Sequence, residues 1–189
     1  MRRLVVAVTG STGSIYGARL LEVLRPIQEV ETHLIISAAG KRTLVHELDA
    51  QVADVESLAD VVYDNRDIGA ALASGSFKTA GMAIVPCSIK TLADLATCHA
   101  DTLIARAGDV TLKEGRPLVV VPRETPLHVP HLRQMLALAE AGAVILPPMP
   151  AFYHRPQSIQ DVVDHTVGRI LDRLGIDHGL VPEWTGRGT

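Results

Sequence analysis

The chain opens with a short β-branched run that passes directly into a turn of glycine and hydroxyl residues. Residues 4–8 read Leu-Val-Val-Ala-Val and residues 9–14 read Thr-Gly-Ser-Thr-Gly-Ser, after which apolar residues recur at helical spacing from Ile15 to Leu24. A buried strand, a tight turn and a helix start, in this order, place backbone N–H groups and small hydroxyls where an anion can bind. The same residues also suit a purely structural turn, because such turns favour glycine and an N-cap Ser or Thr.

This turn differs from two common nucleotide-binding loops. It has no lysine, which separates it from the G-x-x-x-x-G-K-[ST] loop, and it lacks the full G-x-G-x-x-G spacing of dinucleotide-binding folds. What remains suits a single phosphate group.

Composition excludes several classes of protein. With 189 residues, 47% of them hydrophobic, the chain can fill one domain, while a net charge of −3 and 3% aromatic residues give no support to a nucleic-acid partner. The first apolar run is too short for an export signal, and no segment reaches the roughly eighteen apolar residues of a membrane span. Cys87 and Cys98 form no disulfide or zinc pattern, which indicates a reducing compartment. We therefore expect a soluble, cytoplasmic protein with no membrane partner.

Further apolar runs alternate with helical patterns along the chain. Strands are expected at residues 32–36, 82–85, 118–121 and 143–146, and helices at 39–48, 91–97, 103–112, 131–141 and 159–174. The strand runs are continuous, as in strands buried on both faces of a parallel sheet. The alternation predicts an α/β fold with a single doubly wound, mostly parallel sheet and helices on both faces, Rossmann- or flavodoxin-like. We expect residues 1–175 to form this domain. Residues 176–189 are expected to form a tail, either disordered or packed on a neighbouring subunit.

Sheets of this kind bind ligands beyond the carboxyl ends of their strands, so the residues there are candidates. The strand at 82–85 is followed by a hydroxyl-bearing turn, Pro-Cys-Ser-Ile-Lys-Thr at 86–91. Lys90 would oppose the helix dipole unless an anion is present, so it either holds part of a phosphorylated ligand or is simply solvated. Cys87 reads as a small packed residue, and Ser37, after the second strand, reads by itself as a helix cap.

Charged residues gather at two further places. Arg106, Asp109 and Lys113 share one helix face, which fits either a salt-bridged stripe or an anion clamp. The next strand ends in Pro-Arg-Glu-Thr-Pro at 122–126, where Arg123 and Glu124 lie between two prolines. This pattern favours a rigid site element over an ordinary surface turn.

The segment at residues 147–156 reads Pro-Pro-Met-Pro-Ala-Phe-Tyr-His-Arg-Pro, typical of a stiff pocket wall, a lid or a subunit contact. His128 and His131 flank Pro130 with no third ligand nearby, so no metal site is predicted there. No Asp-rich Mg²⁺ motif is present either. Phosphate chemistry would then rely on Arg, Lys and backbone donors.

Six motifs in order resemble the flavin prenyltransferase (UbiX) family, within the homo-oligomeric flavin-containing cysteine-decarboxylase-like flavoproteins. The resemblance runs from Val5 to about Trp184. The motifs are Thr-Gly-Ser-Thr-Gly at 9–13, Ala-Ser-Gly-Ser-Phe at 73–77, Pro-Cys-Ser-Ile-Lys-Thr at 86–91, Leu-Lys-Glu at 112–114, Arg-Glu-Thr-Pro at 123–126 and Pro-Ala-Phe-Tyr at 150–153.

The resemblance implies that reduced FMN binds between the subunits of a dodecamer and is alkylated at N5 and C6 by dimethylallyl monophosphate. The product, prenylated FMN, would serve a UbiD-type decarboxylase. Implied FMN-binding residues are Gly10, Ser11, Thr12, Ser37, Ser88, Ile89, Lys90, Thr91 and Arg123. Implied substrate-binding residues are Tyr153, Arg169, Arg106 and Trp184, and implied catalytic residues are Lys113, Glu124 and Glu47, the last assisting proton movement near N5.

The residues fit this chemistry. Monophosphate is a reluctant leaving group, so its departure calls for preorganised positive charge, which Lys113, Arg123 and Arg169 could supply without a metal. Glu124 could pass a proton to the leaving group. Two glycines depart from the family pattern, Gly108 and Gly115, and are expected to loosen their helix end by about 1 kcal/mol each relative to alanine.

Three other functions compete with this one. The first is an oxidative decarboxylase of cysteinyl substrates, but such enzymes carry Pro-Ala-Ser-Ala-Asn-Thr where this chain has residues 86–91. The second is the small, FMN-binding subunit of a hydroxyarene-carboxylate decarboxylase acting on 4-hydroxybenzoate or vanillate. The third is a flavin carrier without catalytic activity, which would not need Lys113 or Glu124.

Overall fold

One parallel sheet forms the centre of the molecule. A computed structural model describes residues 1–181 and residue 186. Six strands lie in the order β3-β2-β1-β4-β5-β6, and every neighbouring pair is parallel. The strands are β1 (Arg2–Val8), β2 (Val30–Ile36), β3 (Val61–Asp64), β4 (Gly81–Cys87), β5 (Leu118–Pro122) and β6 (Val144–Ile145). This confirms the predicted doubly wound α/β fold.

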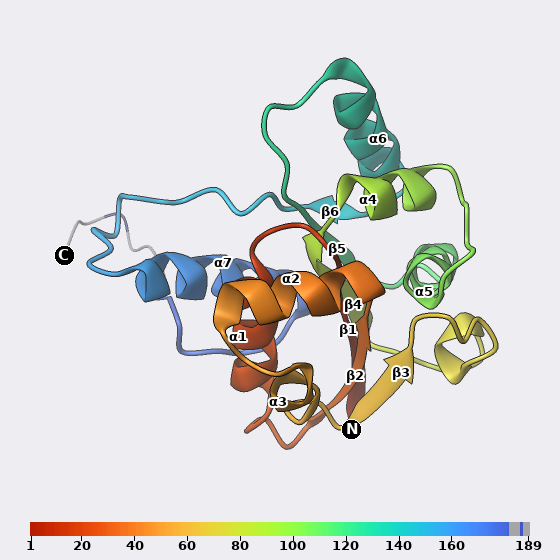
Figure 1. The fold of residues 1–189 in the computed structure, drawn as a ribbon, viewed down its shortest axis with the longest axis horizontal. Helices are drawn as coiled ribbons and strands as arrows, with labels where there is room; N and C mark the ends of the chain where they lie inside the picture. Colours follow the sequence, from red (N-terminus) through yellow and green to blue (C-terminus); the bar gives the residue numbers. More distant parts are fainter. Residues whose placement is uncertain (182–185, 187–189) are drawn as a thin grey trace.

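Helices cover both faces of the sheet (Figure 1). One face packs against α1 (Ser14–Leu24), α2 (Ala38–Leu48), α3 (Val52–Glu56) and α7 (Ile159–Leu174). The other face packs against α4 (Ile89–Ala96), α5 (Leu103–Lys113) and α6 (Val129–Glu140). Successive side chains of a strand point to opposite faces of the sheet. In β1, Val6 and Val8 are buried in the first core, and Val5 and Ala7 in the second. This explains why the strands read as continuous apolar runs.

The predicted helices and strands are found within about two residues of their expected ends, a normal uncertainty for element boundaries. The sequence patterns did not predict β3, α3 or a 3₁₀ turn at Ala71–Ala73. β3 is an edge strand of only four residues, half-buried and exposed in alternation, so it lacks the apolar run of the others. α3 has five residues, too few for a helical period to stand out.

The two unusual glycines have different roles from the one expected. A Cβ at Gly108 would collide with the Leu95 side chain, so this glycine lets α5 pack closely on α4. Gly115 lies beyond the end of α5 with φ of 65°, a left-handed conformation that glycine adopts without strain. Gly115 therefore lies outside the helix, in a conformation suited to glycine, whereas Gly108 lies inside α5, where the expected loosening stays a prediction.

The end of the domain extends slightly beyond Gly175. Ile176 is buried in the first core, and the His178 ring lies against Gly168 of α7. Residues 176–181 therefore pack on their own chain, whereas most of the tail lies outside the described residues and its packing stays a prediction. Within residues 1–181, no helix combines the length and apolar character needed to cross a membrane.

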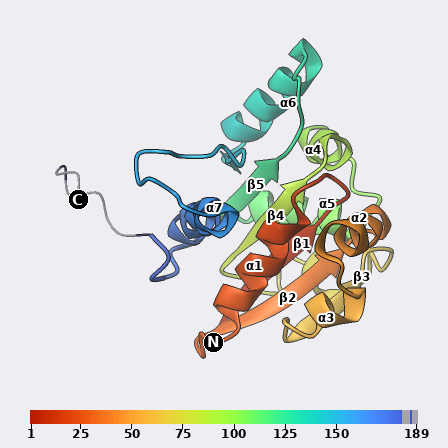
Figure 2. The ribbon, with the colours of Figure 1, turned by 60° about the vertical axis from the view of Figure 1, so that its left-hand side comes forward.

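Strand order fixes where a ligand can bind. The chain moves outward from β1 to β2 and β3, then returns to place β4 on the other side of β1. The loops after β1 and β4 therefore diverge to opposite faces and leave a crevice at their carboxyl ends, the usual ligand position in such sheets. Figure 2 shows α1 and α4, which follow these two strands, on opposite sides of the sheet.

Candidate active site

A buried threonine joins the two loops at this crevice. The Thr9 hydroxyl donates to the carbonyl oxygen of Pro86 at 2.8 Å and accepts from the Ser88 N–H at 2.7 Å. It is almost completely buried, so both hydrogen bonds are shielded from water. The sequence pattern marks Thr9 as part of the turn, but it does not identify Thr9 as the residue that fixes the two loops to each other. Its place directly after the strand was the available signal.

Glu47 closes part of the expected anion site. Its carboxylate accepts hydrogen bonds from the N–H groups of Gly13 at 2.9 Å and Ser14 at 2.8 Å, at the start of α1. Burial alone would raise the pKa of Glu47, but the hydrogen bonds from Thr12, Ser14 and Gly13 outweigh it and lower the pKa. The N–H groups of this turn do bind an anion, as the sequence suggests, but two of them bind the ionised side chain of Glu47 from α2.

The rest of the turn still fits a phosphate ester. The Ser11 hydroxyl is buried and has no hydrogen-bond partner among the described residues, so it can donate to a ligand oxygen. Gly10 faces Ala39 so closely that any side chain there would collide with the first turn of α2. The Thr12 hydroxyl is hydrogen-bonded to Glu47, so Ser11 rather than Thr12 is the candidate donor to a ligand from this turn.

The turns after β2 and β4 are each capped by a serine. The Ser37 hydroxyl accepts from the Gly40 N–H at 2.9 Å, and the Ser88 hydroxyl accepts from the Thr91 N–H at 3.3 Å. Lys90 lies exposed in the first turn of α4 and donates to Asp94 at 2.7 Å. Asp94 offsets the unfavourable position of this cation at a helix N-terminus, so Lys90 is stable there without a ligand.

Arg123 and Glu124 follow β5 at the same edge of the sheet. Both are exposed, and the Arg123 N–H donates to the carbonyl oxygen of Cys87 at 3.2 Å, which joins the loop to the end of β4. Burial raises the pKa of Tyr16 on α1, while the charge of Arg123 and a hydrogen bond with Thr166 oppose this shift. Tyr16 therefore lies between Arg123 and α7, a linking role that the sequence did not reveal.

Tyr153 contacts α7 one helical turn before Arg169, which pairs with Asp172. The Tyr153 hydroxyl lies 2.9 Å from Nε2 of His165, one helical turn before Arg169. Arg169, His165 and Thr166 line one cavity of about 240 Å³ between α7 and the end of β6. Through Thr166 and Tyr16, this α7 cluster (Tyr153, His154, His165, Arg169) continues toward Arg123.

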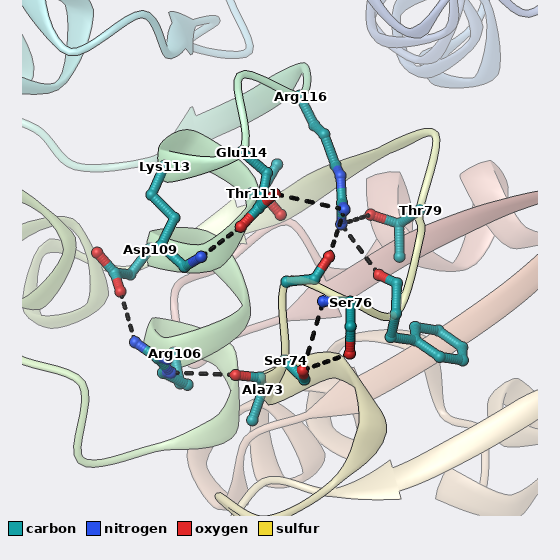
Figure 3. A network of polar contacts seen from close by, with 12 residues as sticks. Ala73, Ser74, Ser76, Thr79, Arg106, Asp109, Thr111, Lys113, Glu114 and Arg116 are labelled. Atoms are coloured by element: carbon teal, nitrogen blue, oxygen red, sulfur yellow. Dashed lines mark hydrogen bonds and ion pairs between the residues drawn. The ribbon is translucent and has the colours of Figure 1, made fainter.

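The remaining charged candidates form a separate α5 cluster, made of Arg106, Asp109, Lys113, Glu114 and Arg116 with the loop at residues 73–79 (Figure 3). Arg106 donates to Asp109 at 2.8 Å and to the Ala73 carbonyl at 3.2 Å, and Lys113 pairs with Glu114. Arg116 donates to the carbonyl oxygens of Gly75 at 2.7 Å and Phe77 at 3.0 Å. The network holds the loop against the end of α5.

Chain direction separates the Lys113 end of the α5 cluster from the crevice. The first residue of α5 bonds to Asn65 just after β3, and its last residue, Lys113, precedes the start of β5. Lys113 therefore lies toward the amino ends of the strands, and Arg123 at their carboxyl ends. One chain does not bring these two candidates together.

Two further features of the sequence can be placed in the structure. The rings of His128 and His131 stack at 3.5 Å, and residues 1–181 contain no group of three or more His, Cys, Asp or Glu side chains arranged to hold a metal. Cys87 is fully buried, and burial raises the pKa of its thiol, as befits a packed residue. Trp184 lies outside the described residues.

The comparisons with known proteins agree with this geometry. A model of the Flavoprotein family matches residues 1–171. Flavin prenyltransferase UbiX of Escherichia coli K12 is 54% identical over 98% of this chain and 100% of its own length. The structure of AnUbiX (PadA1) in complex with FMN and dimethylallyl pyrophosphate has a TM-score of 0.96 at 48% identity, covering 98% of both chains. A dodecameric FMN-dependent UbiX-like decarboxylase from E. coli O157:H7 has a TM-score of 0.95 at 47% identity, covering 97% of this chain and 100% of its own.

The fold and the family match thus define a flavoprotein of the doubly wound α/β class. Within that class, the chain belongs to the flavin prenyltransferase (UbiX) family.

Proposed function

We propose that this protein transfers the dimethylallyl group of dimethylallyl monophosphate to reduced FMN, making prenylated FMN. The C–O bond of the ester breaks as phosphate leaves, and the allylic carbon bonds to the flavin. N5 of reduced FMN would form the first bond and lose its proton. For ring closure, the alkene of the transferred group would take up a proton, its dimethyl-substituted carbon would bond to C6, and C6 would release a proton, so that no oxidant or reductant is needed. The observation that carries the proposal is the crevice with its buried, unpartnered Ser11 hydroxyl, in a chain 54% identical to a flavin prenyltransferase.

The crevice residues would hold FMN. Ser11, Thr12 and Ser88 offer hydroxyls around the two loops that Thr9 joins, and Gly10 lets the turn lie close to α2. Arg123 adds positive charge at the end of β5. Ser37, Ile89, Lys90 and Thr91 complete the proposed set at the neighbouring strand ends.

Glu47 would act as an anion in this site. Hydrogen bonds from Thr12, Ser14 and Gly13 lower the pKa of Glu47 despite its burial, so its carboxylate is ionised at neutral pH and can accept a proton rather than supply one. That assigns Glu47 to the receiving side of proton movement near N5. It also keeps the turn in shape, since it holds Gly13 and Ser14.

Phosphate departure would rest on positive charge from two sources. Arg169, together with Tyr153 of the α7 cluster, would bind the ester, and Arg123 would be the second cation, linked to this cluster through Tyr16 and Thr166. Lys113 and Arg106 would come from the α5 cluster of an adjoining copy, since one chain holds Lys113 away from the crevice. Glu124 would protonate the leaving phosphate.

Exposed apolar side chains support assembly of several copies. Val129, Leu132 and Leu136 lie along one side of α6, each more than half exposed, and α6 stands out from the body in both views of the fold (Figures 1 and 2). Met149 and Phe152 are similarly exposed in the loop after β6. Such a surface is typical of an interface. We propose a dodecamer, the assembly of the E. coli O157:H7 relative.

The test is an anaerobic incubation of purified protein with reduced FMN and dimethylallyl monophosphate, followed by mass spectrometry of the released flavin. A flavin heavier by one five-carbon unit is expected. Unchanged flavin that remains bound would favour a carrier. Release of CO₂ from 4-hydroxybenzoate by the protein alone would favour a decarboxylase subunit.

The product would be handed to a UbiD-type decarboxylase. An aromatic acid decarboxylase of this type, prepared without cofactor, should gain activity when mixed with this protein, reduced FMN and the prenyl ester. We place the activity in the cytoplasm, because both cysteines are free, one buried and one exposed.

A further inference from the structure

Tyr153 and His165 form a pair whose geometry is well defined. The Tyr153 hydroxyl lies 2.9 Å from Nε2 of His165, and the two rings meet edge to face with centroids 5.8 Å apart. Tyr153 lies in the loop after β6 and is 61% exposed. His165, by contrast, is anchored on α7. The histidine is therefore the fixed member of the pair.

A second histidine holds the His165 ring in place. The rings of His154 and His165 stack with centroids 4.9 Å apart and planes within 5° of parallel. Both ring nitrogens of His154 are buried without a hydrogen-bond partner among the described residues, so this ring serves His165 as a packing surface. The stack limits the directions in which His165 can present Nε2.

The charges around His165 favour its neutral form. Burial, followed by His154 and Arg169, lowers the pKa of His165, while Asp172 raises it. A neutral imidazole carries its hydrogen on one nitrogen only, so Nε2 either donates to the tyrosine oxygen or accepts its hydrogen. These two arrangements have opposite consequences for an anion near Tyr153.

We propose that His165 is a positioning residue that directs the Tyr153 hydroxyl toward the phosphate of the prenyl ester. When Nε2–H donates to the tyrosine oxygen, the tyrosine O–H can donate to a phosphate oxygen. When Nε2 instead accepts, the tyrosine presents only lone pairs to the anion. A phosphate beside Arg169 selects the first arrangement. The inference rests on the proposed function, which places Tyr153 at the phosphate.

The test compares His165→Leu, which removes the hydrogen bond, with His165→Gln, which keeps an N–H donor. Calorimetric titration of dimethylallyl monophosphate into protein loaded with oxidised FMN gives the Kd without turnover, and assays with reduced FMN give KM and kcat. For His165→Leu we expect Kd and KM to rise about five- to tenfold, the loss of one hydrogen bond, with a smaller change in kcat. His165→Gln should restore most of the affinity. FMN affinity and melting temperature should match the wild type.

A double-mutant cycle shows whether His165 affects ester binding through Tyr153. In a Tyr153→Phe background, His165→Leu should change the Kd no further, because the hydroxyl that it orients is absent. His99→Leu, an exposed histidine after α4, is the matched control and should leave every value unchanged.

Three results would overturn the inference: an unchanged Kd in His165→Leu, additive effects in the double mutant, or a joint loss of FMN binding and melting temperature. The proposed function can fail independently of this inference. If wild-type protein binds the ester but transfers no prenyl group, the transferase proposal fails while the Kd values still support the role of His165. If the wild type does not bind the ester, both fail.

Discussion

The crevice and the α5 cluster carry charge in different ways. In the crevice, the charged and hydroxyl side chains belong to the loops that directly follow β1, β4 and β5. The buried Thr9 joins the loops after β1 and β4. In the α5 cluster, the cations are already paired: Arg106 with Asp109 and Lys113 with Glu114. Lys90 and Arg169 are paired as well, with Asp94 and Asp172, but among the described residues the Arg123 side chain forms no ion pair, so the crevice offers a ligand one unpaired cation within a single chain. The α5 cluster has the composition of a phosphate clamp but needs a second chain to meet a ligand.

The sharpest test of this difference is a mixed oligomer. Lys113→Ala and Arg123→Ala should each lower turnover about 100- to 1000-fold, because each removes preorganised charge from the leaving phosphate. If the two residues serve one site from different copies, coexpressing both variants rebuilds roughly a quarter of the sites with both wild-type residues, assuming random association. Activity of the mixture against each variant alone is the measurement.

Lys78→Ala is the matched control for the lysine change, since Lys78 is an exposed lysine near the same loop. It should turn over like wild type. If the mixed oligomer is as inactive as the two variants, Lys113 and Arg123 do not act across a subunit boundary, and the composite site is wrong.

Glu124→Gln tests the crevice side alone. Glu124 is exposed, and its carboxylate accepts from the Thr125 N–H at 3.0 Å, which holds it near the end of β5. Removing a general acid of this kind should lower kcat about 100-fold while FMN affinity stays as in the wild type. Stopped-flow absorbance with reduced FMN measures the step. Glu140→Gln, an exposed glutamate on α6, should behave like wild type, and an active Glu124→Gln enzyme would remove this residue from the mechanism.

Glu47→Gln tests how far the crevice depends on a charge from a neighbouring helix. The folded-state pKa of Glu47 is lowered, so its contribution to stability is present above its ordinary pKa and is lost as pH falls through the folded-state value. At pH 7 the variant should lose about 1 kcal/mol of unfolding free energy, as for a helix cap. Urea unfolding at pH 7 and pH 3 should give a difference from wild type that shrinks in acid. A constant difference, or an equal loss in the control Glu29→Gln, would contradict this.

The sequence predicted the crevice better than the α5 cluster, and the reason is physical. Residues such as Ser88 and Arg123 follow apolar strands directly, and parallel strands end at one edge, so chain order alone places them together. Tyr16 and His165 were missed because their roles depend on which helices pack side by side, which local periodicity does not encode. The occupation of the α1 N-terminus by Glu47 was missed for the same reason: the two are 33 residues apart.

Lys90→Met is the prediction with the smallest expected effect, and it separates two interpretations of this residue. The residue could hold a phosphorylated ligand or be a solvated lysine, and its ion pair with Asp94 makes it stable without a ligand. An exposed pair at this spacing contributes only about 0.3–0.5 kcal/mol, so Lys90→Met should hardly change the unfolding free energy. If Lys90 also holds FMN, the same variant should weaken FMN binding several-fold, measured by flavin fluorescence, and more strongly at low salt. Asp94→Asn is the matched control, because it breaks the pair but keeps the cation, and it should bind FMN at least as well as wild type. Equal FMN affinity in Lys90→Met and wild type would leave Lys90 as a solvated lysine.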